Sequence, residues 1–341
     1  MQPSGDGIAP VGWSQPAAVS QSGRASKGRG FGMALAPASA PETALTPFAA
    51  ILHAGGADAL PGTPLVVRVP LPQLSGEPLA ELWQTPGPVT SGLSGSVRWA
   101  AAGPLLAGAL ELPARDAGAL EAAACFAYRE LLALSAERGF PHLLRLWNVV
   151  PGINRLEAGL ERYRRFCRGR AEAFEGHHGP LFQSRLCASS AVGSTGEELV
   201  TWFLACRERG VARENPRQVS AYSYPPCYGP RSPSFARATR CPATGGGWLL
   251  LSGTASIVGH RSVHPGDVRR QLEETLRNLE ELLPAETGVR FHGLKVYLRH
   301  ARDLATVRDA IEARLGTELP VLYVQADICR EELLLEIEGV A

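Results

Sequence analysis

Two glutamates near the C-terminus have the spacing and surroundings expected of a catalytic acid. Residues 333–335 are all leucine, and they run directly into Glu336-Ile337-Glu338. Because side chains alternate along a strand, both acids face the same side. A carboxyl group among apolar residues has a raised pKa and can donate a proton near neutral pH. The alternative is an edge strand that carries two solvated glutamates. Glu336 is the candidate general acid.

The segment from Glu214 to Arg237 is rich in proline, tyrosine and arginine, and it shows neither helical nor strand periodicity. Proline fixes φ and removes a donor, so this irregular loop keeps its shape at little entropic cost on binding. Arginine presents planar donor forks, and tyrosine adds flat walls and hydroxyls. The combination suits a small, planar, anionic ligand, whereas the alternative is a structural crossover whose arginines cap carbonyls. The candidates are Arg217, Arg231, Arg237, Tyr222, Tyr224 and Tyr228.

Other candidates lie at the ends of expected strands. Arg155 follows a turn after the strand at 142–150, and Arg299 ends the strand at 291–298. Gly253 allows close approach of the backbone, and Thr254 lies beside it on an expected strand. Cys329 lies seven residues before Glu336, on the other arm of an expected hairpin. A buried cysteine is usually inert, and no neighbouring histidine or lysine marks this one as a nucleophile.

Composition excludes several classes of protein. The 341-residue chain is 45% hydrophobic and has a net charge of +1, so nothing in its overall charge favours nucleic acid or an anionic membrane surface. No apolar run has the length of a transmembrane helix. The seven cysteines form no Cys-x-x-Cys pair and the histidines have no carboxylate at ligand spacing, so we expect no metal and reduced thiols in a cytoplasmic protein.

The expected elements repeat along the chain. Strand 142–150 and helix 157–174 correspond to strand 291–298 and helix 303–315, since His142-Leu-Leu-Arg-Leu-Trp resembles His292-Gly-Leu-Lys-Val-Tyr. We therefore expect an α+β fold of two halves, with helices on one face of a mixed sheet in each half and a ligand at the seam. The remaining expected elements are helices 117–138 and 267–283 and strands 199–206, 248–257 and 320–326.

The halves are expected over residues 45–206 and 207–341. Residues 1–44 precede them as a disordered extension, because the first 32 residues are rich in Gly, Ser and Pro and contain no apolar signal region. Met33 is the only methionine after the first residue, and we interpret it as the true start of the protein.

Several long motifs in one order resemble the chorismatase family, from about residue 45 to the C-terminus. They are Pro151-Gly-Ile-Asn-Arg, residues 161–170, residues 214–237, Ser252-Gly-Thr-Ala-Ser-Ile-Val-Gly-His, and Asp327-Ile-Cys-Arg followed by Leu335-Glu-Ile-Glu. The resemblance implies a fold related to the YjgF/RidA deaminases, also described as chorismate mutase-like, with the two halves imitating part of that trimer. It implies that Glu336 protonates the enolpyruvyl methylene of chorismate. It implies no metal, flavin or pterin cofactor.

The resemblance also implies which product is formed. Members that form 3-hydroxybenzoate carry a cysteine and a glycine at the positions of Cys329 and Gly253, and the cysteine assists proton movement during aromatisation. The expected protein is a cytoplasmic monomer that converts chorismate to 3-hydroxybenzoate and pyruvate. The alternatives are a chorismatase that forms both 3- and 4-hydroxybenzoate, a hydrolytic one that gives a dihydroxycyclohexadiene carboxylate, and a ligand-binding YjgF/RidA-like protein. The substrate-binding residues it suggests are Arg155, Tyr222, Tyr228, Arg231, Gly253, Thr254 and Arg299.

Overall fold

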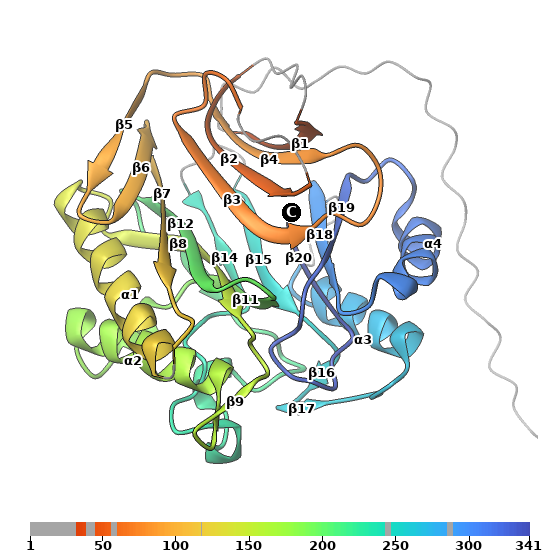
Figure 1. The fold of residues 1–341 in the computed structure, drawn as a ribbon. Coiled ribbons are helices and arrows are strands. Elements are labelled where there is room, and N and C mark those ends of the chain that lie inside the picture. The colour runs from red at the N-terminus through yellow and green to blue at the C-terminus, as the bar shows by residue number, and fades with distance from the viewer. Residues whose placement is uncertain (1–31, 39–44, 56–59, 117, 243–246, 285–288) are drawn as a thin grey trace, which may run out of the picture.

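Three large sheets surround a shared interior, and helices cover the outside of two of them (Figure 1). The structure is a computed structural model that describes residues 32–38, 45–55, 60–116, 118–242, 247–284 and 289–341. The mixed sheets and separately packed helices confirm the predicted α+β class.

The first six-stranded sheet carries α1 and α2 on one face. Helix α1 (Ala119–Glu137) buries alanines and leucines against α2 and the sheet, and the left-handed Gly139 follows its end. Helix α2 (Arg162–His178) packs beside it with Phe166 and Phe174 buried. In spatial order, the strands are β11 (Ala188–Ser194), β8 (His142–Pro151), β12 (Glu198–Cys206), β7 (Leu105–Pro113), β6 (Val97–Ala102) and β5 (Val89–Ser94).

The second six-stranded sheet has the same plan. Helix α3 (Val268–Glu280) begins at Asp267, whose side chain accepts the backbone N–H of Arg270, and α4 (Leu304–Leu315) lies near it. In spatial order, the strands are β19 (Val321–Gln325), β18 (Gly293–Leu298), β20 (Leu335–Val340), β15 (Leu249–Thr254), β14 (Ala238–Arg240) and β13 (Val211–Arg213).

The two sheets are repeats of one unit. Each runs as three strands, a helix, a strand, a second helix and two strands, and the two strand orders match one to one. Within each unit the fourth and fifth strands are parallel, β8 with β11 and β18 with β19. The predicted duplication is therefore confirmed, including the pairing of the two motifs that begin at His142 and His292.

A third sheet repeats four of the six strands of this plan, without helices. Its pairing is antiparallel for β1 with β4 and β4 with β2, and parallel for β2 with β3. The same pattern runs through β7, β12, β8 and β11 of the first sheet and through β15, β20, β18 and β19 of the second. The prediction of one sheet per half therefore missed this third sheet. Its strands are β1 (Gly32–Pro37), β4 (Leu79–Thr85), β2 (Thr46–Ala54) and β3 (Leu65–Pro72).

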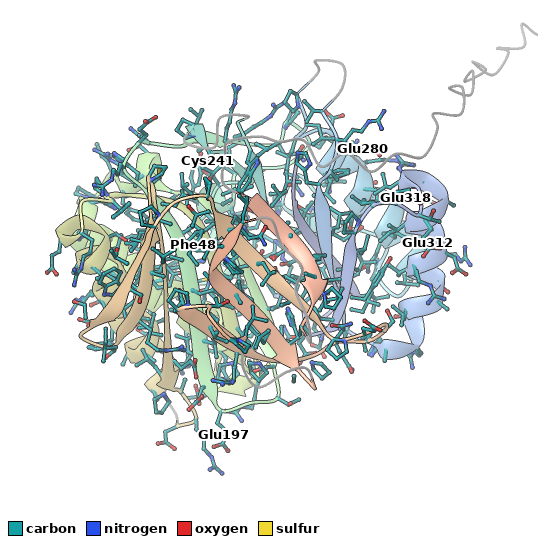
Figure 2. All side chains as sticks on the ribbon, turned by 90° about the horizontal axis from the view of Figure 1, so that it is seen from above. Phe48, Glu197, Cys241, Glu280, Glu312 and Glu318 are labelled. Atoms are coloured by element: carbon teal, nitrogen blue, oxygen red, sulfur yellow. The ribbon has the colours of Figure 1, made fainter. Side chains whose placement is uncertain are left out.

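The inner faces of all three sheets meet in one hydrophobic core. Trp83 from the third sheet contacts Trp147 of β8, with ring centroids 5.8 Å apart, and Trp147 stacks on Trp202 of β12 at 5.6 Å. Figure 2 shows Phe48 inside this core, whereas Glu312 and Glu318 lie at the periphery. Large aromatic rings each bury a large apolar area and contribute strongly to such a junction.

Two expectations about local structure are wrong. Gly32–Pro37 form β1, so they do not belong to a disordered extension; residues 1–31 and 39–44 lie outside the described residues. The second helix begins at Arg162 and not at 157, because Leu156–Glu157 (β9) and Leu160–Glu161 (β10) form a small hairpin. Ala158 and Gly159 turn this hairpin with φ of 48° and 76°, a conformation that a helix cannot contain.

The remaining short elements connect these sheets. Strands β16 (Ile257–Val258) and β17 (Arg261–Ser262) form a second small hairpin. The 3-10 helices are η1 (Phe182–Arg185), η2 (Ala221–Ser223), η3 (Pro226–Tyr228) and η5 (Ala301–Asp303).

Candidate active site

A cavity of about 390 Å³ lies where the two repeated units meet. Strand β11 of the first unit runs beside β15 of the second, and α2 and the segment 214–237 supply further walls. The cavity therefore lies at the seam that the duplication predicts. Its polar lining residues are Asn154, Glu161, Tyr163, Arg164, Arg170, Ser189, Ser190, Tyr224, Tyr228, Arg237, Cys329, Arg330, Glu331, Glu332 and Glu336.

Glu336 enters the cavity from β20, and its side chain is almost fully buried. Its carboxyl group occupies the space above Gly253 on the adjacent strand. A Cβ atom at position 253 would overlap Oε1 of Glu336 and would lie 2.6 Å from its Cδ. Glycine is therefore required at position 253 for the Glu336 carboxyl group to keep this place. The sequence predicts that this glycine allows close approach of the backbone, and the group that approaches it is the Glu336 carboxyl group.

The surroundings of Glu336 favour its protonated form. Burial raises the pKa of Glu336 to about 8, and the negative charge of Glu338 adds to the effect. Arg145 and Arg237 oppose the shift, but they do not outweigh burial. At neutral pH this carboxyl group holds a proton that it can donate into the cavity.

Cys329 lies in the loop between β19 and β20 and faces the same cavity. Burial, together with the nearby Glu336, raises the pKa of this thiol far above its ordinary value, so it is neutral at neutral pH. Arg299 fixes the loop from outside the cavity. Its guanidinium pairs with Asp327 at 2.7 Å and donates to the backbone oxygens of Ile328, Arg330 and Leu333.

Four arginines, Arg164, Arg170, Arg237 and Arg330, bring positive charge to the cavity wall. Arg237 is 3% exposed, and it donates to the hydroxyl of Tyr224 at 2.8 Å and to the Val219 carbonyl at 3.0 Å. Arg330 stacks on Tyr228, with its Cζ atom 4.1 Å from the ring centroid. The buried Nε atoms of Arg170 and Arg237 have no hydrogen-bond partner among the described residues. These guanidinium groups are suited to the carboxylates of a bound molecule.

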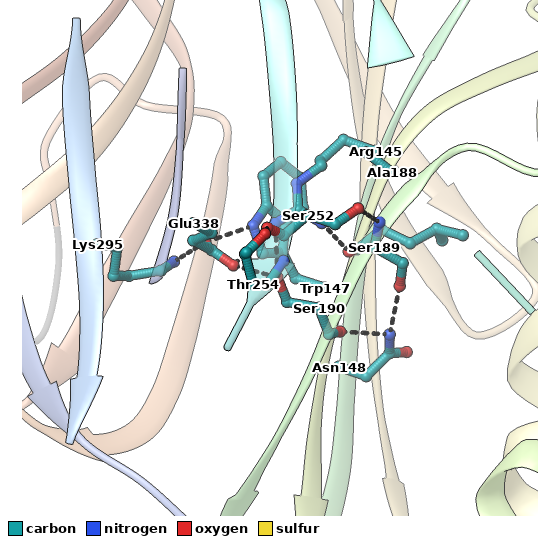
Figure 3. A network of polar contacts seen from close by, with 12 residues as sticks. Arg145, Trp147, Asn148, Ala188, Ser189, Ser190, Ser252, Thr254, Lys295 and Glu338 are labelled. Atoms are coloured by element: carbon teal, nitrogen blue, oxygen red, sulfur yellow. Dashed lines mark hydrogen bonds and ion pairs between the residues drawn. The ribbon is translucent and has the colours of Figure 1, made fainter. Parts of the chain in front are cut away.

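Serine hydroxyl groups join the two units beneath the cavity (Figure 3). The backbone N–H of Ser189 donates to Ser252 Oγ at 2.9 Å, and the N–H of Gly253 donates to Ser190 Oγ at 2.8 Å. Asn148 Nδ2 donates to the Ser190 carbonyl at 2.9 Å. This seam fixes β15 against β11 and therefore fixes Gly253 relative to the acid.

The predicted site residues separate into two groups. Glu336, Cys329, Gly253 and Tyr228 meet in the cavity, and Arg299 braces the loop of Cys329. Four others do not line the cavity. The exposed Arg155 lies 4.0 Å from Glu157, Arg231 pairs with Glu175 at 2.7 Å, Tyr222 packs on the first unit's hydrophobic core, and the buried Thr254 hydroxyl donates to the Ser252 carbonyl.

Sequence reasoning did not select Arg170, Arg330, Tyr163, Ser189 or Ser190. It named Arg237 as a candidate for an anionic ligand, with bracing of the loop as the alternative, and Arg237 does line the cavity. Tyr163 and Arg170 are seven residues apart on α2, which places both on one helix face. That periodicity was visible within the motif at 161–170. Ser189 and Ser190 had no comparable signal, because their role depends on a neighbouring strand distant in the sequence. Arg217 does brace the loop, since it donates to Asn278 at 3.0 Å and pairs with Glu274.

Two further observations concern metals and membranes. Within the described ranges, no group of three or more His, Cys, Asp or Glu side chains is arranged to hold a metal ion. No described helix is both long enough and apolar enough to cross a membrane.

Comparisons with known proteins agree with this architecture. Residues 81–205 match the family described as Chorismatase FkbO/Hyg5-like, N-terminal. A solved chorismatase structure superposes with a TM-score of 0.82 at 34% identity, covering 91% of this chain and 98% of that chain.

Two relatives from Streptomyces hygroscopicus match most of the chain. A 3-hydroxybenzoate synthase is 39% identical over 283 residues, which cover 78% of this chain and 82% of the relative. A chorismatase is 40% identical over 279 residues, which cover 77% of this chain and 79% of the relative. With this identity spread over both units, the chain belongs to the chorismatase family.

Proposed function

We propose that this protein converts chorismate to 3-hydroxybenzoate and pyruvate. The observation that carries the proposal is the buried carboxyl group of Glu336 in a cavity lined by arginines, where burial raises its pKa to about 8. The relatives named 3-hydroxybenzoate synthase and chorismatase support the same reaction. Chorismate is a small dianion of a size that suits this cavity.

In the first step, Glu336 gives its proton to the methylene carbon of the enolpyruvyl group. The carbon attached to the ether oxygen then becomes an oxocarbenium-like centre, and the ether becomes a good leaving group. A general acid works best when its pKa lies near the working pH, and Glu336 meets this requirement. An ordinary solvated glutamate would be ionised and would have no proton to give.

The arginines hold the two carboxylates of the substrate. Arg237 and Arg170 are buried with unpartnered Nε atoms, and Arg330 is fixed on the ring of Tyr228. Binding of a dianion also neutralises Arg237, which otherwise lowers the pKa of Glu336. The substrate therefore strengthens the hold of Glu336 on its proton until the methylene carbon accepts it.

In the second step, the ring hydroxyl at C4 attacks C3 and displaces pyruvate, giving an arene-oxide-like intermediate. The C4–O bond of the epoxide breaks, so the oxygen stays on C3 and takes up a proton. The ring then loses the hydrogen at C3 as a proton, and aromatisation gives 3-hydroxybenzoate. Chorismate is thereby divided into two products without added water or redox partner. The proton released by the attacking hydroxyl returns Glu336 to its starting state.

Cys329 and Gly253 favour this route over hydrolysis. The neutral Cys329 thiol lies in the same cavity as Glu336 and can pass a proton during ring opening. Gly253 lets the Glu336 carboxyl group lie against β15, which leaves the opposite side of the cavity to the ring.

The experiment is to incubate the purified protein with chorismate, measure pyruvate, and separate the organic acids by chromatography. Equal amounts of pyruvate and 3-hydroxybenzoate are expected. Additional 4-hydroxybenzoate would replace the proposal by the dual-product reaction, and a non-aromatic diene acid would replace it by hydrolysis. Absence of pyruvate would leave only binding of chorismate.

We also propose that the protein acts as a cytoplasmic monomer. The three sheets of one chain already enclose a common core, which removes one reason to assemble with further copies. Light scattering coupled to gel filtration tests this directly, and a mass of a dimer or trimer would contradict it.

A further inference from the structure

A set of buried charged groups lies beside Glu336, and the proposed reaction uses none of them. Arg145 on β8, Lys295 on β18, Glu338 on β20 and Glu81 on β4 are each at most 8% exposed. All three sheets contribute to the set. Burying charges is costly unless each is paired, so their retention at one place requires an explanation.

Glu338 is the centre of this set, as Figure 3 shows. Its Oε1 atom accepts from Trp147 Nε1 at 2.8 Å and lies 2.8 Å from Lys295 Nζ. Its Oε2 atom accepts from Arg145 Nη2 at 2.8 Å and from the Ser190 hydroxyl. Four donors, two of them cationic, satisfy a carboxylate and leave no place for a proton.

A second carboxylate completes the charge balance. Lys295 Nζ donates to both oxygens of Glu81, at 2.8 and 3.0 Å, and His53 Nε2 lies 2.9 Å from Glu81 Oε1. Burial alone would raise the pKa of Glu81, but Lys295 and His53 lower it to about 2. Glu81 and Glu338 thus balance Lys295 and Arg145. A charge on Glu336 would be an additional negative charge in the same region.

Glu336 and Glu338 lie two residues apart on one strand and face the same side, about 7 Å apart along the strand. Burial favours the neutral form of both. For Glu338, the directly bound Lys295 and Arg145 outweigh burial and hold the pKa below its ordinary value. For Glu336, the attraction of Arg145 and Arg237 does not outweigh burial, and the pKa is raised. Two neighbouring carboxyl groups with opposite protonation states are typical of acid catalysis.

We infer that Glu338 is a positioning residue whose permanent negative charge keeps the proton on Glu336, and that Arg145 and Lys295 hold Glu338 in this role. The inference rests on the proposed function of Glu336 as the acid. Ser190 adds a structural link, because its hydroxyl donates to Glu338 while accepting from Arg145 and from the N–H of Gly253, beneath the acid.

Other titratable groups near Glu336 also affect its protonation, or are neutral and do not. Arg145 and Arg237 are the cations that favour its ionised form. Tyr297 lies on β18 directly opposite Glu336. Burial raises the pKa of both Tyr297 and Cys329, so both are neutral at neutral pH. Glu338 is thus the ionised carboxylate that acts on Glu336 from its own sheet.

The test compares the pH dependence of kcat/KM for pyruvate release in the wild type and four variants. E338Q removes the charge, E338D retains it, E338Q/K295M removes one cation as well, and E318Q makes the same chemical change at an exposed position. For E338Q we expect kcat/KM to fall roughly tenfold or more at pH 8, with little change at pH 5.5, because Glu336 ionises earlier. E338D and E318Q keep the wild-type shape, and E338Q/K295M regains part of the alkaline activity.

A purely structural role for Glu338 predicts a different result: E338Q loses activity equally at every pH, E338Q/K295M is worse, and thermal unfolding shows loss of the fold. Either equal loss or a failure of K295M to restore alkaline activity overturns the inference. If E338Q does not fold, the comparison of E338D with E338Q/K295M still tests it.

A readout without substrate separates this inference from the proposed function. The infrared band of a protonated carboxyl group, assigned by its loss in E336Q, is expected at pH 7 in the wild type and at reduced intensity in E338Q. If the band behaves so but chorismate is not consumed, the proposed function fails and the inference stands. If chorismate is consumed but E338Q leaves the band unchanged, the inference fails alone.

Discussion

Replacing Glu336 by glutamine removes the titration of a buried carboxyl group and keeps its size. The pKa of this group is raised from 4.5 to about 8 in the folded protein. Between these values the folded chain binds a proton that the unfolded chain has lost, so the wild type loses stability as the pH rises from 4.5 to 8. Glutamine imitates the protonated form at every pH, so E336Q does not lose stability in this range. The free energy of unfolding of E336Q should therefore rise relative to that of the wild type by roughly 3 kcal/mol between pH 5 and pH 8.

Thermal unfolding followed by circular dichroism at half-unit steps from pH 5 to pH 9 measures this effect. In a chain of this length the advantage corresponds to a rise of about 5 °C in the Tm difference between E336Q and wild type, levelling off above pH 8. E318Q, which changes an exposed glutamate, should follow the wild-type curve. Parallel curves for E336Q and wild type would refute a protonated Glu336 at neutral pH.

Three further substitutions test the cavity. G253A places a methyl group where the Glu336 carboxyl group lies, and we expect pyruvate release to fall at least about 100-fold while chorismate binding changes less, measured by steady-state kinetics and calorimetry. C329A should keep pyruvate release within about tenfold but divert product from 3-hydroxybenzoate to a non-aromatic acid; an unchanged product ratio in chromatography would argue against a role for the thiol. R237M should raise KM about tenfold or more, and it should move the alkaline limb of the pH profile to higher pH, because Arg237 lowers the pKa of Glu336. An unchanged KM would place the substrate carboxylates elsewhere.

The sequence predicts those features that depend on local periodicity. Helices α1, α3 and α4 and strands β8, β12, β18 and β19 lie within a few residues of their expected positions. The duplication was visible because the motifs at His142 and His292 each combine a strand with the helix that follows. Glu336 was recognisable because apolar residues precede it directly.

Features that depend on distant partners were not predicted. Strand β1 lies in a stretch of small residues with no strand pattern of its own, and its pairing with β4, more than forty residues away, gives it structure. The selection of arginines failed for a related reason. Arg231 and Arg155 stand in the expected loops but point to nearby glutamates outside the cavity, whereas Arg170 reaches the cavity from the middle of a helix.

The buried charges illustrate the same limit. Arg145 and Lys295 occupy equivalent positions of the two repeated motifs, which the sequence shows. That both bind Glu338 follows only from the way the three sheets enclose one core. The partner of a buried charge is set by tertiary structure, and no spacing along the chain identifies it.

The role of Glu336 as the acid is tested most directly by comparing chorismate binding and pyruvate release in the wild type and E336Q at pH 7. Calorimetry measures binding, and lactate dehydrogenase coupling measures pyruvate. The structure predicts that E336Q binds chorismate within a few-fold of the wild-type affinity and releases pyruvate at least about 1,000 times more slowly, since an amide cannot donate the proton. Pyruvate release by E336Q at a rate near that of the wild type would contradict the assignment.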